Sequence, residues 1–177
     1  MRELLTPSDA LAGLRRMAIE IRGPVLQQAT AGELLLVGIR RGGVPLAQHL
    51  AQLLREAGTP VEVGSVDMTL YRDDAATTLP STRIGQTELP VDVGARRIIL
   101  VDDVLYTGRT VRAALDELLD YGRPACVELA VLVDRGGREL PIQPNYAVLT
   151  QAIAPSERVE VLEADGGWRA VAEDLPK

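Results

Sequence analysis

Apolar residues recur along the chain at two different spacings, and together these predict alternating helices and strands. Apolar positions three and four residues apart form one stripe from Pro7 to about Ile21, after a Thr6 N-cap and before the breaker pair Gly23-Pro24. The same helical pattern, each time followed closely by a glycine, returns at residues 44–57 and 110–121. Three helices are therefore expected.

Strand signals separate these helices. Residues 33–39, 96–101 and 126–133 are short apolar runs, as in strands buried on both faces. Residues 61–70 alternate and are rich in β-branched side chains, and further strands are expected at 146–150 and 158–162. Because helices and apolar strands alternate, we expect an α/β fold: a twisted, mostly parallel sheet flanked by helices, in a single domain spanning residues 1–177.

The segment Tyr71–Pro90 interrupts this alternation. It is polar, rich in small residues and without a period. A loop of this length in a compact domain is usually functional or mobile. We therefore expect a flexible loop at about residues 72–90.

The overall composition is that of a folded protein that does not enter membranes. Hydrophobic residues make up 46% of the 177 residues and charged residues 25%, which argues against disorder of the whole chain. No apolar run approaches the ~18 residues that cross a membrane, and the N-terminus lacks a secretory signal, so a cytoplasmic location is expected. The net charge of -6 argues against a general nucleic-acid coat.

Three residue types that occur only once exclude whole classes of chemistry. Cys126 is the only cysteine, so an internal disulfide or a thiolate metal cluster is excluded, and we expect it to be buried as a small apolar residue. His49 is the only histidine, which excludes a histidine-rich zinc site, and we expect it to be exposed or partly buried. Lys177 is the only lysine and ends the sequence, which argues against the lysine of a P-loop or of a pyridoxal phosphate enzyme.

One segment joins an apolar strand to a helix through groups that bind sugars and phosphates. In residues 98–110 (IILVDDVLYTGRT) the strand ends in Asp102 and Asp103, and Thr107–Thr110 opens the next helix. Ligands bind beyond the carboxyl ends of parallel strands, and a helix N-terminus favours an anion such as a phosphate. Two carboxylates repel a phosphate but accept hydrogen bonds from hydroxyls or bind a divalent cation. A phosphate beside vicinal hydroxyls describes a ribose 5-phosphate.

The same segment carries a family resemblance. VDDVLYTGRT resembles the phosphoribosyl diphosphate (PRPP) binding motif of type I phosphoribosyltransferases. With DMTLYRDD before it and LAVLVDRGGRELPI after it, the chain resembles the PyrR family, pyrimidine operon regulatory proteins that also act as uracil phosphoribosyltransferases. The resemblance extends from about Leu11 to Ile142 and implies a single-domain type I phosphoribosyltransferase fold. It also implies a reaction in which uracil and PRPP, with Mg²⁺ as the cofactor, give UMP and diphosphate.

The resemblance assigns roles to residues of this chain. Asp102 and Asp103 would be catalytic, binding the ribose hydroxyls and Mg²⁺ and stabilising positive charge on the sugar in the transition state. The 72–90 loop would act as a hood that closes over the site and excludes water. Residues 40–43 (RRGG), after the strand at 33–39, would be the diphosphate-binding loop, and Thr107–Thr110 would hold the 5-phosphate. The PRPP contacts would come from Arg40, Arg41, Gly42, Arg72, Tyr106, Thr107, Gly108, Arg109 and Thr110. The residues near the base would be Val133, Asp134 and Arg135.

Tyr106 bears on the choice of base. Purine transferases that are similar in this loop place an aspartate at this position, where it handles the proton on purine N7. A tyrosine is a poor base at neutral pH, and uracil has no N7. The residue therefore favours uracil, with a transferase for a purine or orotate as the alternative.

The resemblance also implies a second role, the binding of pyrimidine operon messenger RNA in response to UMP. The candidate RNA contacts are Arg15, Arg16, Arg22 and Arg138. Gly137 and Ile19 stand where relatives carry histidine, which argues against RNA binding. Because the family has this second role, an RNA regulator with little catalysis is the alternative from a different class of function. A homodimer or higher homo-oligomer is expected from the family, since a dimer would pair the RNA patches.

Overall fold

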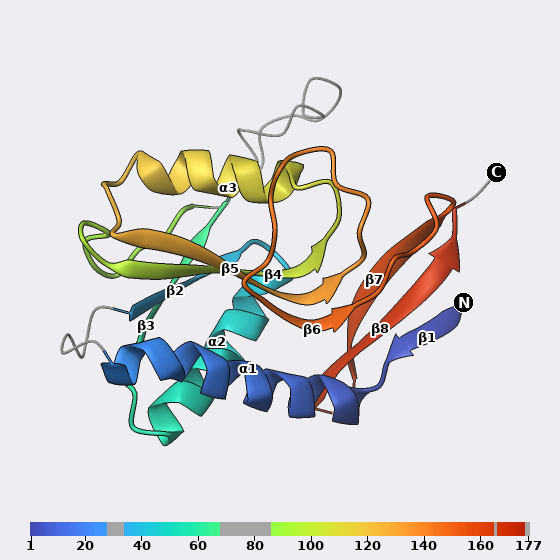
Figure 1. Ribbon diagram of the computed structural model, residues 1–177, viewed down its shortest axis with the longest axis horizontal. Coiled ribbons are helices and arrows are strands. Elements are labelled where there is room, and N and C mark those ends of the chain that lie inside the picture. The colour runs from blue at the N-terminus through green and yellow to red at the C-terminus, as the bar shows by residue number, and fades with distance from the viewer. Residues whose placement is uncertain (28–33, 68–85, 165, 176–177) are drawn as a thin grey trace.

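The computed structural model describes residues 1–27, 34–67, 86–164 and 166–175, and Figure 1 shows how their helices and strands are arranged. In chain order the elements are β1 (Arg2–Leu5), α1 (Pro7–Gln27), β2 (Leu34–Ile39), α2 (Gly43–Glu56), β3 (Glu62–Val66), β4 (Arg97–Leu105), α3 (Arg109–Leu119), β5 (Cys126–Asp134), β6 (Tyr146–Thr150), β7 (Glu157–Ala164) and β8 (Gly167–Asp174). They form two sheets. The central one has five strands, and the second has three.

The central sheet has the strand order β3-β2-β4-β5-β6, and every neighbouring pair is parallel. All six residues of β2 are buried, as its unbroken apolar run predicts for a strand covered on both faces. The expected α/β class and the mainly parallel sheet are therefore confirmed.

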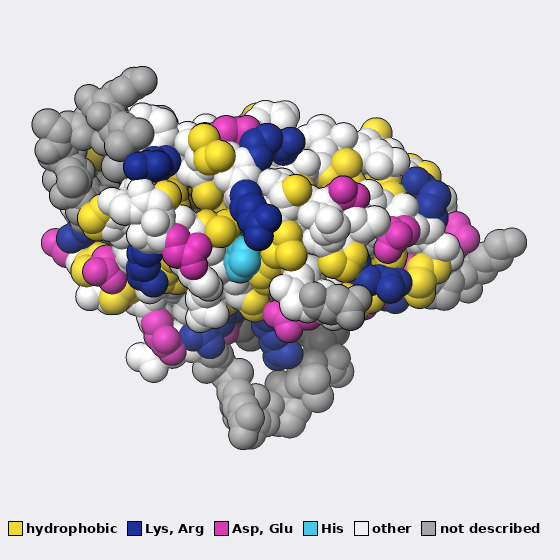
Figure 2. All heavy atoms as spheres, turned by 90° about the horizontal axis from the view of Figure 1, so that it is seen from below, with side chains coloured by type: hydrophobic (Ala, Val, Ile, Leu, Met, Phe, Trp, Pro, Cys, Tyr) yellow, Lys and Arg dark blue, Asp and Glu magenta, His cyan; other side chains and the backbone are white. Residues whose placement is uncertain are grey.

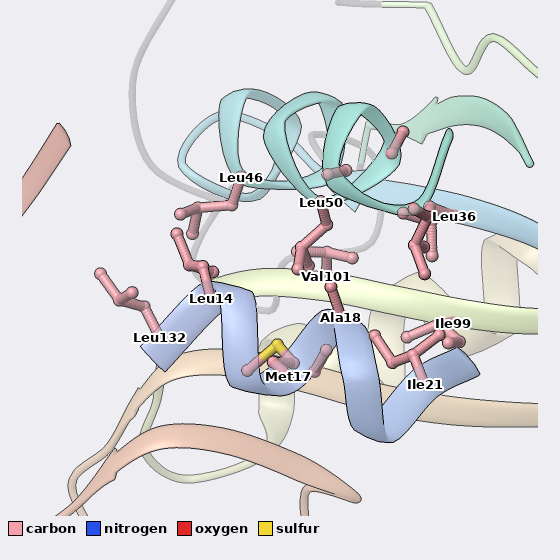
Figure 3. Close-up of a cluster of buried hydrophobic side chains, with 14 of the residues drawn as sticks. Leu14, Met17, Ala18, Ile21, Leu36, Leu46, Leu50, Ile99, Val101 and Leu132 are labelled. Carbon is pink, nitrogen blue, oxygen red and sulfur yellow. The ribbon is translucent and has the colours of Figure 1, made fainter. Parts of the chain in front are cut away.

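The alternation of side chains along these strands divides the core into two layers. One layer packs against α1 and α2 on one face of the sheet; Figure 3 shows Leu14 and Ala18 of α1 facing Leu46 and Leu50 of α2, with Val101 of β4 between them. The other layer packs against α3 on the opposite face (Figure 1). Both faces of the sheet are thus covered by helices, which leaves its edges and strand ends for ligands.

The second sheet joins the two ends of the chain. Its order is β1-β8-β7, with antiparallel pairing throughout. β7 lies within one or two residues of its expected position, whereas β1 and β8 are not predicted by the local pattern. Trp168 of β8 is 8% exposed and lies in the core layer under α1 and α2, so this sheet is anchored to the same core.

The first helix is longer than expected. α1 continues through Gly23 and Pro24 to Gln27, although a proline removes a backbone donor and favours a helix end. Arg97 Nη1 donates to the Ile21 carbonyl at 2.9 Å, a partner from outside the helix close to the proline. Tertiary packing of the apolar face therefore overrides the local breaker signal.

Three further expectations have different outcomes. The His49 side chain is partly buried, as expected. The prediction that Cys126 is buried is wrong: it is exposed, because it is the first residue of β5 and precedes the covered part of the strand. Most of the 72–90 loop, with Arg72, lies outside the described residues, of which 86–90 return to the sheet through a bridge between Ser65 and Glu88.

In the part of the chain that the structure describes, no helix is both long enough and apolar enough to cross a bilayer.

Candidate functional site

The acidic pair lies in the second half of β4. Both acids are inside the strand, with Asp102 opposite Val131 of β5, because β4 continues to Leu105 rather than ending near Val101 as expected. Asp102 is 6% exposed, and its Oδ1 accepts a hydrogen bond from the Asp103 amide at 2.9 Å. Asp103 is partly exposed, and its Oδ1 accepts from the Val104 amide at 2.8 Å. Asp103 is therefore the carboxylate that the site offers to a ligand.

The burial of Asp102 also changes its pKa. Burial raises the pKa of Asp102 well above its ordinary value, and the neighbouring Asp103 carboxylate raises it further. A charged group buried beside a like charge is expensive, so the proton-bound form of Asp102 is favoured. Such a shifted carboxyl group at a strand end is typical of a functional site.

The loop between β2 and α2 packs directly against this pair. A Cβ atom at Gly42 would overlap with the carboxylate of Asp103, and one at Gly43 would overlap with the carbonyl oxygen of Val101. Only glycine leaves room for so close an approach. The Arg40–Arg41 peptide bond is cis. The predicted diphosphate loop, residues 40–43, is thus in contact with the predicted ribose-binding acid.

Arg40 and Arg41 line an open cleft of about 880 Å³ between the start of α2, β3 and residues 86–90. Arg40 Nε donates to Ser65 Oγ at 3.2 Å, and Arg40 Nη2 pairs with Glu88 Oε1 at 3.0 Å. Arg41 is exposed. Sequence reasoning missed Glu88, because no residue near it in the sequence indicates that it pairs with Arg40.

The TGRT turn, Thr107–Thr110, leads from β4 into α3. Gly108 is the N-cap with φ +91°, a left-handed conformation that favours glycine, and as a glycine it has no side chain with which to cap the helix. The Arg109 amide donates to Thr107 Oγ1 at 3.3 Å, and the Arg109 guanidinium pairs with Glu139 at 2.7 Å on the surface. Thr110 is exposed. A helix N-terminus whose N-cap is a glycine, next to a hydroxyl and a guanidinium, is suited to a phosphate.

The 134–142 loop follows β5 and lies against the TGRT turn. Val133 is fully buried in the core and is paired with β4 on one side and β6 on the other. Asp134 is 6% exposed and pairs with Arg138 at 2.6 Å, not with its neighbour Arg135. The Arg135 guanidinium instead lies over the Tyr106 ring, 4.0 Å from its centroid, and donates to the Ala154 carbonyl at 3.1 Å. The predicted base residues and Tyr106 thus form one cluster.

The four predicted RNA contacts have different environments. Arg15 is exposed on α1. Arg16 is bonded to the Ala147 and Val148 carbonyls of β6 and pairs with Glu20, with 57% of its side chain exposed. Arg22 is half-buried, and within the described residues its Nε has no hydrogen-bond partner. Arg138 is turned inward, with 14% of its side chain exposed.

Figure 2 shows the face of the molecule around His49, the only histidine of the chain. Arginine side chains are spread over this face and alternate with acidic and apolar ones. The arginines on the visible part of this face do not merge into one continuous basic patch. Charge alone therefore makes this surface a weak general binder of nucleic acid.

Comparison with known proteins places the chain in a family. Residues 2–163 match the phosphoribosyl transferase domain family. The chain is 48% identical over 166 residues to a bifunctional protein PyrR of Deinococcus deserti, covering 92% of this chain and 89% of that protein. It is 46% identical over 153 residues to a bifunctional protein PyrR of Geobacter sulfurreducens, covering 85% of this chain and 86% of that protein.

Solved structures agree on the fold. The structure of a hypoxanthine-guanine phosphoribosyltransferase (HGPRT-ase) from Leishmania tarentolae in complex with GMP superimposes with a TM-score of 0.69 at 24% identity, covering 86% of this chain and 82% of that one. A hypoxanthine phosphoribosyltransferase of Trypanosoma cruzi has the same TM-score at 18% identity, covering 87% and 83% of the two chains. At such identities the likeness concerns the fold alone. The chain therefore belongs to the phosphoribosyl transferase domain family and, within it, to the bifunctional PyrR proteins.

Proposed function

We propose that the chain transfers the phosphoribosyl group of PRPP to uracil, giving UMP and diphosphate. The observation that carries the proposal is the juxtaposition at the carboxyl end of β4: a partly exposed carboxylate, Asp103, stands a few residues before the TGRT turn, where α3 begins at the glycine N-cap Gly108. Sugar hydroxyls and a phosphate are the ligand groups that these two features bind. Membership of the PyrR family supports the choice of uracil.

The residues divide the substrate between them. The TGRT turn would hold the 5-phosphate through its amides, the hydroxyls of Thr107 and Thr110, and the helix dipole. Asp103 would accept hydrogen bonds from the ribose hydroxyls, which orients the sugar and stabilises positive charge as the bond to diphosphate breaks. Gly42 contacts Asp103, and the two residues before it, Arg40 and Arg41, line the adjoining cleft, where they would bind the leaving diphosphate bidentately.

The acids also bear on Mg²⁺. Within the described residues no group of three or more histidine, cysteine or acidic side chains could hold a metal ion by itself. Mg²⁺ commonly binds through one or two carboxylates together with substrate phosphates and water. The partly exposed Asp103 fits that role beside bound PRPP, whereas Asp102 is buried and favours its proton-bound form. The ion would neutralise charge on the diphosphate as it leaves.

The base would lie against the cluster of Tyr106 and Arg135. Val133 is fully buried and Asp134 is held by Arg138, so neither offers a free side chain to the base. Tyr106 is 39% exposed, and the Arg135 guanidinium lies over its ring. Because the acid of this cluster is held by an arginine, the cluster offers no free carboxylate to take a proton from N7, in accord with a pyrimidine.

A panel of bases tests the reaction. The chain is incubated with PRPP, Mg²⁺ and uracil, hypoxanthine, guanine or orotate, and diphosphate release is measured. We expect release with uracil and little with the others; release with a purine or orotate alone would replace the proposed base, and none with any base would remove the enzyme. Asp103→Asn should lose most turnover, whereas the matched change Asp116→Asn, at an exposed acid on α3 paired with Arg112, should not.

We propose a second role, UMP-responsive binding of pyrimidine operon messenger RNA, supported by the name of the relatives as bifunctional proteins PyrR. Arg15 on α1 is the candidate contact chosen for the test, because it is exposed, whereas Arg16 is bonded to β6 and paired with Glu20. Leader RNA of a pyrimidine operon should bind more tightly with UMP than without, and Arg15→Gln should weaken binding more than Arg158→Gln, an exposed arginine on β7. Binding that ignores UMP and depends on salt alone would indicate nonspecific attraction.

The remaining expectations stay predictions. We propose a homodimer or higher homo-oligomer and a cytoplasmic location, which size measurement and cell fractionation would test.

A further inference from the structure

Arg138 is placed to join the two halves of the candidate site. Its side chain is 14% exposed, and its guanidinium donates in three directions: Nε to the Ile142 carbonyl at 2.8 Å, Nη1 to the Tyr106 carbonyl at 2.9 Å, and Nη2 to Asp134 Oδ1 at 2.6 Å. Asp134 and Ile142 are the first and last residues of the 134–142 loop. Tyr106 immediately precedes the TGRT turn.

The hydrogen bonds of Arg138 are strong because they are charge-assisted and largely buried. The bond to Asp134 joins two charged groups that are both largely buried, and such charge-assisted bonds are about twice as strong as neutral ones. Asp134 Oδ1 also accepts from the Gly136 amide at 3.0 Å, which curls the start of the loop. The planar fork of arginine carries donors on three nitrogens in fixed directions, so it can reach acceptors on different segments, whereas the three donors of lysine share one nitrogen.

A second set of contacts fixes the loop to the turn itself. The amides of Glu139 and Leu140 both donate to the Thr107 carbonyl, at 3.0 and 3.1 Å. Gly108 lies so close that a Cβ atom there would meet Ile142 at 3.3 Å and Leu140 at 3.4 Å. If the loop shifted, the turn would lose two hydrogen bonds and the packing around its N-cap.

We propose that Arg138 is a positioning residue that holds the base-binding part of the site at a fixed distance from the phosphate-binding TGRT turn. This inference rests on the proposed function, since it needs a ligand with a phosphate at one end and a base at the other. Arg138 does not contact the substrate; it acts through the 134–142 loop. Such alignment matters because a misplacement of about 1 Å can cost about 10²-fold in rate.

The assignment differs from a role in RNA binding. The bonds to Ile142, Tyr106 and Asp134 engage all three nitrogens of the Arg138 guanidinium inside the protein. An RNA phosphate would have to break these contacts and leave Asp134 buried and unpaired, which is costly.

The test compares UMP, which has both a base and a phosphate, with ribose 5-phosphate, which has the phosphate but no base. Arg138→Lys keeps the charge but loses the fork, and Arg112→Lys, at an exposed arginine on α3, is the matched control. Calorimetry with UMP and with ribose 5-phosphate should show the Kd of UMP raised about tenfold or more in Arg138→Lys, the Kd of ribose 5-phosphate within about twofold, and both unchanged in the control. Equal loss of both ligands, or no loss of UMP, would overturn the proposal.

A readout without any ligand separates this inference from the proposed function. Amide hydrogen exchange at Glu139 and Leu140 should accelerate about tenfold or more in Arg138→Lys, while amides in the middle of β5 should not change. If the wild-type chain failed to bind UMP, the proposed function would fall, and the exchange rates would still decide whether Arg138 holds the loop. Unchanged exchange with weakened RNA binding would return Arg138 to the RNA surface. If Arg138→Lys does not fold, Asp134→Asn gives the same two readouts, because it removes the charge from the same bond.

Discussion

The closest contact between the predicted diphosphate loop and the predicted ribose-binding acid can be probed with a single methyl group. Gly42 has φ -63° and ψ -31°, a right-handed conformation that alanine adopts readily. Its backbone therefore does not require glycine. What requires glycine is the space, because a Cβ atom would overlap with the Asp103 carboxylate and lie 3.0 Å from Asp103 Cβ. Gly42→Ala thus perturbs Asp103 and little else.

The size of the effect follows from these distances. Ordinary contact begins near 3.4 Å, so the Asp103 carboxylate would have to move by about 1 Å. A displacement of about 1 Å at a catalytic group can lower the rate by about 10²-fold. The carboxylate can rotate away, so the packing cost should be near the low end of the usual 1–3 kcal/mol, roughly. It is offset by about 0.4–1 kcal/mol because alanine reduces the entropy of the unfolded chain.

The assay is therefore a pair of measurements on one variant. We expect kcat for UMP formation to fall about 10²-fold while Tm changes by no more than about 4 °C. Gly43→Ala is the contrasting variant, because its methyl group would overlap with the backbone oxygen of Val101, which cannot rotate away, so Tm should fall clearly. Full activity of Gly42→Ala would refute the reasoning, since it would mean that the Asp103 carboxylate can move without consequence.

Three further predictions concern neighbouring groups. Burial raises the pKa of Asp102, so its contribution to the free energy of unfolding is fully present below the ordinary pKa and is lost as pH rises through the raised value. Urea unfolding should therefore show Asp102→Asn becoming more stable relative to wild type as pH rises, and a difference that stays constant with pH would contradict this. Glu88→Gln removes the acid that pairs with Arg40, an exposed ion pair worth about 0–1 kcal/mol. Arg40 would then be free for the diphosphate of PRPP, so initial rates should show a KM for PRPP lowered by up to about fivefold; a raised KM would show that Glu88 orients the arginine instead. Gly137→Ala places a methyl group at φ +77° against the Tyr106 ring, which should cost at least about 1–2 kcal/mol and lower Tm by roughly 2–8 °C; an unchanged Tm would mean that the ring moves freely.

Local signals predicted the central sheet and the TGRT turn because each is encoded by neighbouring residues. The apolar run of β2 and the change from apolar strand to glycine turn before α3 can be read over about ten residues. The strand β8 pairs with β1 from the other end of the chain, so no local pattern reveals either of them. The exposure of Cys126 depends on where the sheet begins to be covered, which is also a property of the assembled fold.

The site shows the same division. The sequence places Asp102 and Asp103 together but does not distinguish them, whereas the structure buries one and leaves the other accessible. Arg138 has an acid four residues before it, but outside a helix this spacing does not predict an ion pair; only the assembled loop shows that its guanidinium reaches Asp134, Ile142 and Tyr106. Contacts between segments far apart in sequence, such as Arg40 with Glu88, carry no signal in a single chain.

The most direct measurement of the central claim is a crystal structure of the chain with ribose 5-phosphate and Mg²⁺. We predict phosphate oxygens at about 3 Å from backbone amides of the TGRT turn, and ribose hydroxyls bonded to the Asp103 carboxylate at about 2.7 Å. A phosphate held elsewhere, for example by Arg41 in the cleft beside α2, with no sugar hydroxyl on Asp103, would contradict the account.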